Sequence, residues 1–215
     1  MKGKFLFLPI AREGVRFILP LLLLTAVFYY RGWLIPAVIF LVLSIFVIAF
    51  FRDPERVCPK VEGGIVSPAD GKVVGIEEVE DALYNGKAVR VSIFLNIFNV
   101  HVNRVPVAGQ IVDIVYNKGK FLNAANDKAS LDNEQNSLLI ETSKGGRIVV
   151  RQIAGLIARR IVCWVKKGEF ISRGERFGLI RFGSRTDIFL SLGTEISVKV
   201  GDKVKGGRDL IGVLK

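Results

Sequence analysis

The hydrophobic residues of the chain follow two different patterns, which meet near residue 51. Residues 17–30 and 33–51 form two uncharged apolar runs, and Arg31-Gly32 separates them. As a helix at 1.5 Å per residue, the second run is about 28 Å long, close to the roughly 30 Å hydrocarbon core of a bilayer. The first run is about 21 Å long and spans a bilayer only if residues 10–16 extend it. Residues 1–51 are therefore predicted to form a membrane-anchoring helical hairpin.

Charged residues around this hairpin indicate its orientation. The connecting turn carries only Arg31, whereas both outer ends are flanked by basic residues: Lys2, Lys4, Arg12 and Arg16 before it, and Arg52, Arg56 and Lys60 after it. By the positive-inside rule, both ends and the domain that follows lie on the cytoplasmic face of the cell membrane. A monotopic hairpin within one leaflet is the alternative to a span. A cleaved signal peptide is disfavoured because a second, longer apolar run follows at once.

From residue 52 onward, the apolar residues form short runs bounded by Gly, Asn, Asp and Pro, which is typical of β-strands. No long stretch has a clear helical period, and short helical pieces are expected only at residues 96–99 or 157–162. We expect a mostly β domain over residues 52–215, with strands at residues 72–76, 88–95, 110–116, 137–141, 147–153, 177–182 and 187–190.

Two stretches of this domain share one form. Residues 164–175 and 198–207 each read as a strand, a glycine turn and a second glycine turn. This form resembles the hammerhead of biotinyl and lipoyl carrier domains, which have a barrel-sandwich-hybrid fold. Those carriers present a lysine on a tight hairpin, and no such turn occurs here. The resemblance therefore predicts a barrel-sandwich-hybrid-like β domain with short helices, and not a carrier function.

Charge and rare residues narrow the possible partners. The formal net charge of +11 favours an anionic partner, either nucleic acid or anionic lipid. The apolar N-terminal segment favours lipid, and the aromatic residues do not cluster with the basic ones as in nucleic-acid binders. Two cysteines and one histidine do not make a zinc set, so no metal is expected. Two reduced thiols are ordinary for a cytoplasmic protein.

Three residues could carry chemistry. The hydroxyl of Ser184 can attack its own Gly183-Ser184 bond, although a Gly-Ser pair is also an ordinary turn. His101 is the only histidine, and an imidazole can act as base and then as acid, although a lone histidine is often structural. Asp70 lies in a Pro-Ala-Asp-Gly sequence, which suits a β-turn and equally suits a carboxylate that orients His101.

Several motifs occur together in one order: Phe51-Arg52-Asp53-Pro54-Glu55-Arg56, Ser67-Pro68-Ala69-Asp70-Gly71-Lys72-Val73, residues 96–106 around His101, Asn133-Glu134-Gln135-Asn136 and Arg181-Phe182-Gly183-Ser184-Arg185. From about residue 50 to the end, this set resembles the short form of the phosphatidylserine decarboxylase family. The archaeal archaetidylserine decarboxylases are a close variant. Longer members carry an acid two residues before the matching histidine and a Leu-Gly-Ser-Thr cleavage motif. At the matching positions, this chain has Asn99 and Phe182-Gly183-Ser184-Arg185.

The resemblance implies a proenzyme that cuts itself by serinolysis between Gly183 and Ser184. The products are a β chain, residues 1–183, and an α chain, residues 184–215, which form a heterodimer or a higher oligomer of that heterodimer. Ser184 becomes a pyruvoyl group that forms a Schiff base with the substrate amine, without a metal or pyridoxal phosphate. His101 and Asp70 match the processing residues of the family.

The implied reaction converts phosphatidylserine of the membrane to phosphatidylethanolamine, a step of phospholipid biosynthesis. An electron sink is needed because decarboxylation leaves a carbanion at Cα. Candidate substrate-binding residues are Asn99, Arg104, Arg159 and Arg160. The alternative is a non-enzymatic, membrane-tethered hammerhead domain that acts as an adaptor.

Overall fold

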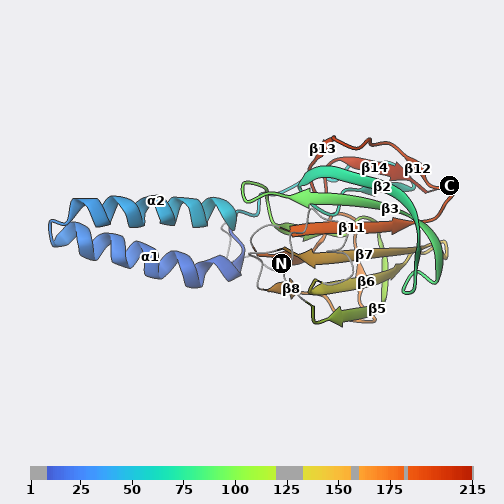
Figure 1. Cartoon of the computed structure of the whole chain (residues 1–215). Coiled ribbons are helices and arrows are strands. Elements are labelled where there is room, and N and C mark those ends of the chain that lie inside the picture. The colour runs from blue at the N-terminus through green and yellow to red at the C-terminus, as the bar shows by residue number, and fades with distance from the viewer. Residues whose placement is uncertain (1–8, 120–132, 156–159, 182–183, 215) are drawn as a thin grey trace. The chain divides into compact units, whose positions relative to one another are not determined.

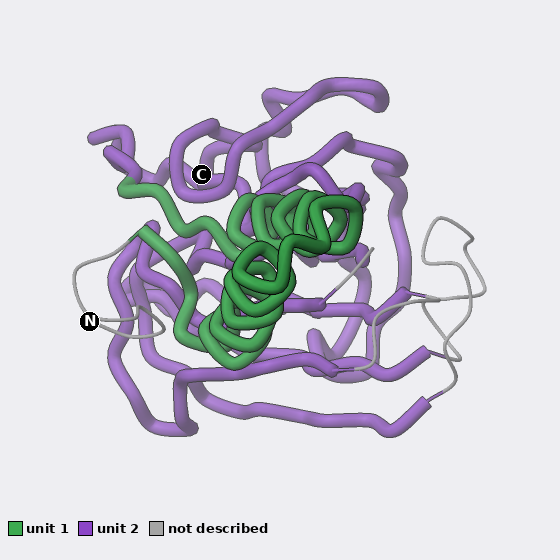
Figure 2. The backbone as a smooth tube through the Cα atoms, turned by 90° about the vertical axis from the view of Figure 1, so that its left-hand side faces the viewer, with its two compact units in different colours: residues 1–55 green, residues 56–215 purple. Residues whose placement is uncertain are grey.

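The computed structural model describes residues 9–119, 133–155, 160–181 and 184–214, and it divides into two units, residues 1–55 and 56–215 (Figures 1 and 2). The boundary expected from the sequence lay between residues 51 and 52. Each unit has its own secondary structure: the first is helical and the second consists of strands.

The first unit is a helical hairpin of α1 (Arg12–Tyr30) and α2 (Leu34–Phe50). Gly32, with a φ of 76°, makes the turn between them. Phe28 of α1 stacks on Phe40 of α2 with ring centroids 5.3 Å apart. α1 begins at Arg12, so residues 12–16 of the expected extension are helical whereas Ile10 and Ala11 are not, and its 19 residues are about 28 Å long.

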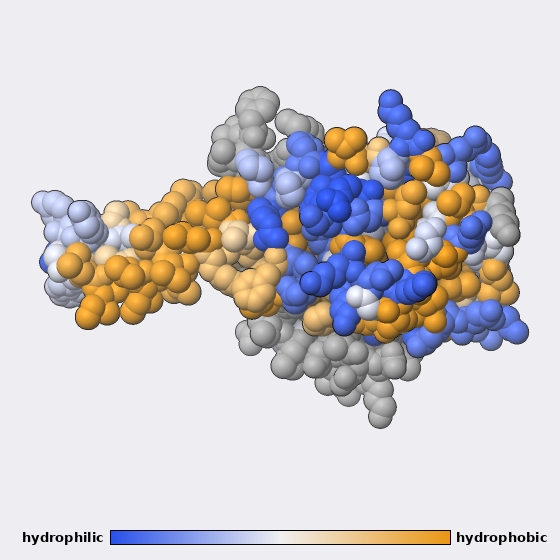
Figure 3. Space-filling view, turned by 90° about the horizontal axis from the view of Figure 1, so that it is seen from above, coloured by the Kyte–Doolittle hydropathy of each residue, from blue (hydrophilic) through white to orange (hydrophobic). Residues whose placement is uncertain are grey.

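Apolar side chains cover the outside of these helices (Figure 3). Leu23 of α1 is 66% exposed and Ile35 of α2 is 77% exposed. Within the described residues, Arg12–Tyr30 has the length and apolar composition to cross a bilayer, and α2 is shorter. Exposed apolar surface of this extent is unfavourable in water and suits a lipid environment.

The second unit is mostly β, as the sequence predicted. Its largest sheet has eight antiparallel strands in the order β13-β2-β3-β11-β7-β6-β5-β9, and Figure 1 shows its central strands side by side. Two three-stranded sheets have the orders β1-β14-β12 and β4-β10-β8. The strands are β1 (Gly64–Val66), β2 (Gly71–Asp81), β3 (Gly86–Leu95), β4 (Val102–Arg104), β5 (Gly109–Asn117), β6 (Gln135–Glu141), β7 (Arg147–Ala154), β8 (Ile161–Cys163), β9 (Phe170–Ile171), β10 (Arg176–Ile180), β11 (Ser184–Leu190), β12 (Glu195–Ile196), β13 (Lys203–Val204) and β14 (Leu210–Val213).

The short helical pieces expected in this unit are not formed by its described residues. Residues 96–99 make a turn in which the Asn99 N–H donates to the Asn96 carbonyl at 3.0 Å. Residues 157–159 lie outside the described residues, and Ile161 and Val162 belong to β8. Pairing with β10 satisfies the backbone of this segment and overrides its weak local preference.

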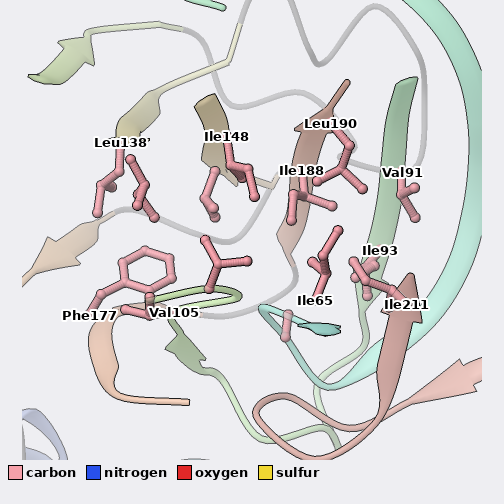
Figure 4. Close-up of a cluster of buried hydrophobic side chains, with 14 of the residues drawn as sticks. Ile65, Val91, Ile93, Val105, Leu138, Ile148, Phe177, Ile188, Leu190 and Ile211 are labelled. Carbon is pink, nitrogen blue, oxygen red and sulfur yellow. The ribbon is translucent and has the colours of Figure 1, made fainter. Parts of the chain in front are cut away.

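The core lies between the large sheet and the two small sheets (Figure 4). Ile188 of β11 points toward Ile65 of β1, and Leu138 of β6 lies opposite Phe177 of β10; all four are buried. Side chains alternate between the two faces of a strand, so Ser184 and Thr186 lie on the same face of β11 as Ile188. The start of β11 therefore presents polar side chains to the interior.

The β domain consists of two similar halves. In the first half, β1–β3 and β11–β14, the carbonyls of Ser67 and Val73 accept N–H groups of Gly207 and Gly201 at 2.9 and 2.8 Å. In the second half, β4–β10, the carbonyls of Val105 and Ile111 accept those of Gly174 and Gly168 at 2.8 and 2.7 Å. The four glycines have positive φ: 71° at Gly207, 103° at Gly201, 80° at Gly174 and 85° at Gly168.

Further details repeat in both halves. The register of β2 against β3 shifts between Val73 and Gly75, and that of β5 against β6 shifts between Ile111 and Asp113. β13 pairs with the start of β2 as β9 pairs with the start of β5. This duplication explains the two similar stretches found in the sequence at residues 164–175 and 198–207.

Candidate active site

Ser184 is the first residue of β11, and β11 lies between β3 and β7. Its register partners are Leu95 at the end of β3 and Ala154 at the end of β7. We call this edge of the large sheet the Ser184 end. The side chain is fully buried, and its Oγ has no hydrogen-bond partner among the residues that the structure describes. A buried hydroxyl without a partner is unfavourable and uncommon in structures, so it marks a position where function is expected.

His101 is also fully buried, directly before β4. Its Nδ1 lies 3.0 Å from the carbonyl oxygen of Asn99. A carbonyl only accepts hydrogen bonds, so Nδ1 carries the proton of the neutral ring and Nε2 carries the lone pair. The His101 carbonyl in turn accepts the N–H of Ile180 at 3.3 Å, only a few residues before Ser184. The fold thus brings His101 to the segment that leads into the predicted cleavage bond, whose Phe182 and Gly183 lie outside the described residues.

Asn99 holds His101 through its backbone. Its side-chain Oδ1 accepts the N–H of Asn96 at 2.9 Å and is therefore part of the turn. The expected substrate contact of the Asn99 side chain stays a prediction. The geometry gives this residue a different role, because its carbonyl selects the tautomer of the imidazole.

A chain of buried amide and hydroxyl groups lies on the core face next to Ser184. The amide of Asn136 donates to Gln152 at 3.0 Å, and the amide of Gln152 donates to Asn103 at 2.8 Å. Asn103 donates in turn to the hydroxyl of Thr186 at 3.2 Å. We call these four residues the polar layer, and all are at most 3% exposed. The sequence analysis missed it, although polar residues alternate from His101 to Asn103 and from Ser184 to Thr186.

The polar layer connects the two strands that carry the reactive residues. Asn103 follows His101 by two residues, and Thr186 follows Ser184 by two residues, so each pair shares one face of its strand. The hydrogen bond between Asn103 and Thr186 therefore sets how β4 lies against β11. Satisfied buried networks of this kind favour one arrangement of the core.

Asp70 is buried and has partners other than His101. Its Oδ2 forms an ion pair with Arg56 at 2.9 Å, and its Oδ1 accepts the N–H of Gly206 at 2.7 Å. No hydrogen bond joins Asp70 to His101 in the described part of the chain. The predicted orienting role of Asp70 therefore stays a prediction, while the Asn99 carbonyl orients the ring in this structure.

The arginines named as substrate-binding candidates lie in different environments. Arg104 is 4% exposed and donates to the Gly174 carbonyl at 3.1 Å, which is a structural contact between β4 and a glycine turn. Arg160 is exposed, and its charge acts on Tyr116, whose pKa is nevertheless raised by burial and by the hydrogen bond to Glu134. Arg159 lies outside the described residues. Of these three, Arg160 alone is seen at the surface near the Ser184 end.

A buried ion pair follows Ser184 on the opposite face of β11. Nε of Arg185 lies 2.9 Å from Oδ1 of Asp187, and Nη2 donates to Oδ2 at 3.0 Å. Both side chains are at most 1% exposed. Because both charges are desolvated, the loss of Arg185 would leave the buried Asp187 carboxylate without its ion-pair partner. This pair holds the first residues of β11 in place.

Two cavities lined by described residues lie away from the Ser184 end. The larger, about 460 Å³, is lined by residues that include Lys144, Arg173 and Ser191. Ser191 follows the last residue of β11, so this cavity is about 20 Å from Ser184 along the strand. No group of three His, Cys, Asp or Glu residues suited to a metal ion occurs among the described residues.

Comparison with known proteins assigns this arrangement to a family. Residues 43–212 match the family described as phosphatidylserine decarboxylase. The phosphatidylserine decarboxylase proenzyme of Geobacter sp. (strain M21) is 49% identical over 212 residues, which cover 96% of this chain and 97% of that protein. The proenzyme of Syntrophus aciditrophicus is 51% identical over 207 residues, covering 94% and 96%. The family resemblance seen in the sequence is confirmed: the chain belongs to the phosphatidylserine decarboxylase family and is a decarboxylase.

Proposed function

We propose that the chain cuts itself between Gly183 and Ser184 and then, as a pyruvoyl enzyme, decarboxylates phosphatidylserine to phosphatidylethanolamine. The observation that carries this proposal is the buried Ser184 hydroxyl without a partner at the start of a central strand. The relatives named proenzymes support a processed precursor. Their name also supplies the substrate class.

The cut needs a base and a positioned hydroxyl. His101 takes the hydroxyl proton at Nε2, since Nδ1 is held by Asn99. Ser184 Oγ adds to the Gly183 carbonyl carbon, the C–N bond breaks, and an ester to Gly183 forms as the Ser184 amine is freed. Loss of the Cα proton of residue 184 expels the Gly183 carboxylate. Water converts the remaining dehydroalanine to the pyruvoyl group, with release of ammonia.

The strand order supports two chains that stay together after the cut. The α chain would contain β11 to β14, and β11 pairs with β3 on one edge and β7 on the other. β13 pairs with β2, and β14 pairs with β1. The core residues Ile188, Leu190 and Ile211 would also come from the α chain. Burial of this apolar surface holds the two chains in one heterodimer.

The pyruvoyl carbonyl would supply an electron sink for the electrons that decarboxylation leaves at Cα of the serine headgroup. We expect His101 to return a proton at that carbon, since it is the only histidine of the chain and its backbone carbonyl accepts the N–H of Ile180, shortly before Ser184. The buried Ser184 end excludes water, which strengthens electrostatic interactions there. The sequence contributes the cofactor atoms itself, so no separate cofactor has to bind.

The helical hairpin accounts for access to a lipid substrate. Its exposed apolar surface suits a bilayer, and the basic residues at its outer ends favour the cytoplasmic side of the cell membrane. The reacting serine headgroup is common to the diacyl lipid and its archaeal ether analogue, so parallel assays with both lipids identify the substrate.

Intact-mass analysis with a carbonyl-trapping reagent tests the proposal. Wild-type protein should give two chains that meet at residue 183, with the reagent on the smaller one. Ser184→Ala should give one uncut chain of 23.8 kDa, and His101→Ala should cut far more slowly. Ser191→Ala is the matched control, because Ser191 is exposed at the other end of β11 and should not affect the cut. A fully active wild-type preparation made of intact chain would contradict the proposal.

A further inference from the structure

An exposed apolar turn lies at the Ser184 end of the β domain. Residues 96–99 follow Leu95, the register partner of Ser184. Within this turn, Phe98 is 71% exposed and Ile97 is 36% exposed. The carbonyl of Asn99, at the end of the same turn, holds the ring of His101. An apolar tip is thus attached directly to the candidate active site.

Three backbone N–H groups of this turn are hydrogen-bonded within the turn. The N–H of Phe98 donates to Oδ1 of Asn96 at 2.9 Å, and the N–H of Asn96 donates to Oδ1 of Asn99 at 2.9 Å. The Asn99 N–H donates to the Asn96 carbonyl at 3.0 Å. Each satisfied N–H lowers the free-energy cost of moving the turn out of water, because unsatisfied groups strongly oppose transfer to an apolar medium. These internal hydrogen bonds make the tip around Phe98 better suited to an apolar environment.

Positive charge surrounds the same end. Lys72 pairs with Phe94 near the end of β3 and with Lys203 of β13, and Lys118 follows the last residue of β5. Farther along β2, away from Ser184, the exposed charges are acidic: Glu77, Glu78 and Glu80. The exposed cations at the Ser184 end are Lys72, Lys118, Arg160, Lys203, Lys205 and Arg208. Basic residues beside an apolar tip match a surface of anionic lipid headgroups.

The chain also begins its β domain at this end. Arg56 pairs with Asp70, which directly precedes β2, and the first residues of β2 pair with the end of β3. The apolar hairpin comes directly before Arg56 in the sequence. A chain held in the bilayer by that hairpin therefore starts its β domain beside the apolar turn.

We propose that the turn at residues 96–99 is a second membrane contact, in which Phe98 and Ile97 insert at the boundary of headgroups and acyl chains. The surrounding cations rest on anionic headgroups. The inference extends the proposed function, because a lipid headgroup must reach the Ser184 end. A bilayer is the partner that fits the apolar tip, its basic surroundings and the apolar hairpin that precedes the β domain in the sequence.

The depth of the turn can be measured on full-length, uncut protein, independently of catalysis. A Ser184→Ala chain with Cys58→Ser and Cys163→Ser receives one new cysteine, Phe98→Cys, which is labelled with the fluorophore NBD. The matched control is Phe170→Cys, since Phe170 is 78% exposed and pairs with Gln110 at the far end of β5. In vesicles of phosphatidylcholine and phosphatidylglycerol, brominated acyl chains should quench the dye at position 98 severalfold more than the dye at position 170.

Equal quenching at the two positions would overturn the membrane contact. It would leave the self-cleavage proposal untouched, because that proposal is tested by mass and not by depth. A second measurement uses cleaved enzyme: Phe98→Ser should raise the apparent KM for lipid at the vesicle surface roughly tenfold, with kcat and the rate of the cut unchanged. Phe98→Leu should restore the KM. An unchanged KM in Phe98→Ser, with normal thermal unfolding, would also contradict the contact.

Discussion

The two halves of the β domain follow the same path but carry different side chains. In the first half, Ile65 of β1 is opposite Gly212 and belongs to the hydrophobic core. In the second half, Asn103 of β4 is opposite Gly178 and belongs to the polar layer. The residue two positions earlier is Gly63 in the first half and His101 in the second. The two halves thus differ in polarity at matching positions, and hydrogen bonds offset the desolvation of the polar groups in the second half.

In the turns that precede β2 and β5, the polar residue lies in the first half instead of the second. Pro68-Ala69-Asp70-Gly71 contains a buried carboxylate, which accepts the N–H of Gly206. Pro106-Val107-Ala108-Gly109 has the same proline and glycine with an exposed alanine in place of the acid. Both halves therefore contribute residues to the candidate site: the first half contributes Asp70 and Ser184, and the second half contributes His101. Neither half alone holds all three.

The largest loss of stability is expected from substitution of Arg185, and Arg151 is its matched comparison. The two arginines directly precede Thr186 and Gln152, which are register partners in β11 and β7. Arg185 is fully buried with Asp187, whereas Arg151 is partly exposed with Asp81. Arg185→Met leaves a buried carboxylate unpaired and should lower the free energy of unfolding by about 3–5 kcal/mol. Arg151→Met should lower it by about 1 kcal/mol.

Urea unfolding of the two arginine variants in a Ser184→Ala background gives the comparison, since the uncut chain unfolds as one molecule. Equal losses of unfolding free energy would show that the difference in burial does not affect the contribution of the two ion pairs to stability.

The role of the polar layer can be tested by comparing Asn103 with Ile65, the apolar residue at the matching position of the first half. Asn103→Ala removes the partner of Gln152 and Thr186, and it should lower the free energy of unfolding by about 1–3 kcal/mol. It should also slow the cut, because β4 loses its contact with β11. Ile65→Val at the matching position should lower stability by about 1 kcal/mol and leave the rate of the cut unchanged. Cutting is followed by the decay of intact mass, and a normal rate in Asn103→Ala would remove the positioning role.

The carboxylate of the first turn has two separable roles. Asp70→Asn and Arg56→Met both remove the ion pair, and each should lower the free energy of unfolding by about 1–2 kcal/mol. Slower cutting is expected only in Asp70→Asn, because only that variant removes the carboxylate proposed to orient His101. If both variants cut at the wild-type rate, Asp70 supports the turn and takes no part in processing.

The smallest difference in stability is expected between variants at Gly168 and Gly201, which occupy equivalent turns of the two halves. Gly168 and Gly201 have φ values of 85° and 103°, and a Cβ added at either meets nothing within 4 Å. Gly168→Ala and Gly201→Ala should therefore each lower the free energy of unfolding by about 1 kcal/mol, through backbone conformation alone. Thermal unfolding of the pair measures this. A clear inequality would show that the two turns are not equivalent.

Local patterns in the sequence predicted the elements well. The uncharged runs became α1 and α2, and each of the predicted strands corresponds to a strand from β2 to β11. Helical length and strand alternation depend on neighbouring residues, so they can be read without the fold. The turn at residues 96–99 was wrongly expected to be helical because its Asn side chains hydrogen-bond the backbone instead.

The sequence by itself determined the candidate Gly183-Ser184 bond, the single histidine and the family, because these depend on residue identity and order. Only the tertiary structure decided which groups meet. In the folded domain, Ser184 is buried at the start of a central strand, and Asn103 hydrogen-bonds Thr186 across the core. Asp70 forms an ion pair with Arg56 and accepts the N–H of Gly206. Hydrogen bonds between residues far apart in the chain depend on how sheets pack, and packing is a property of the whole fold.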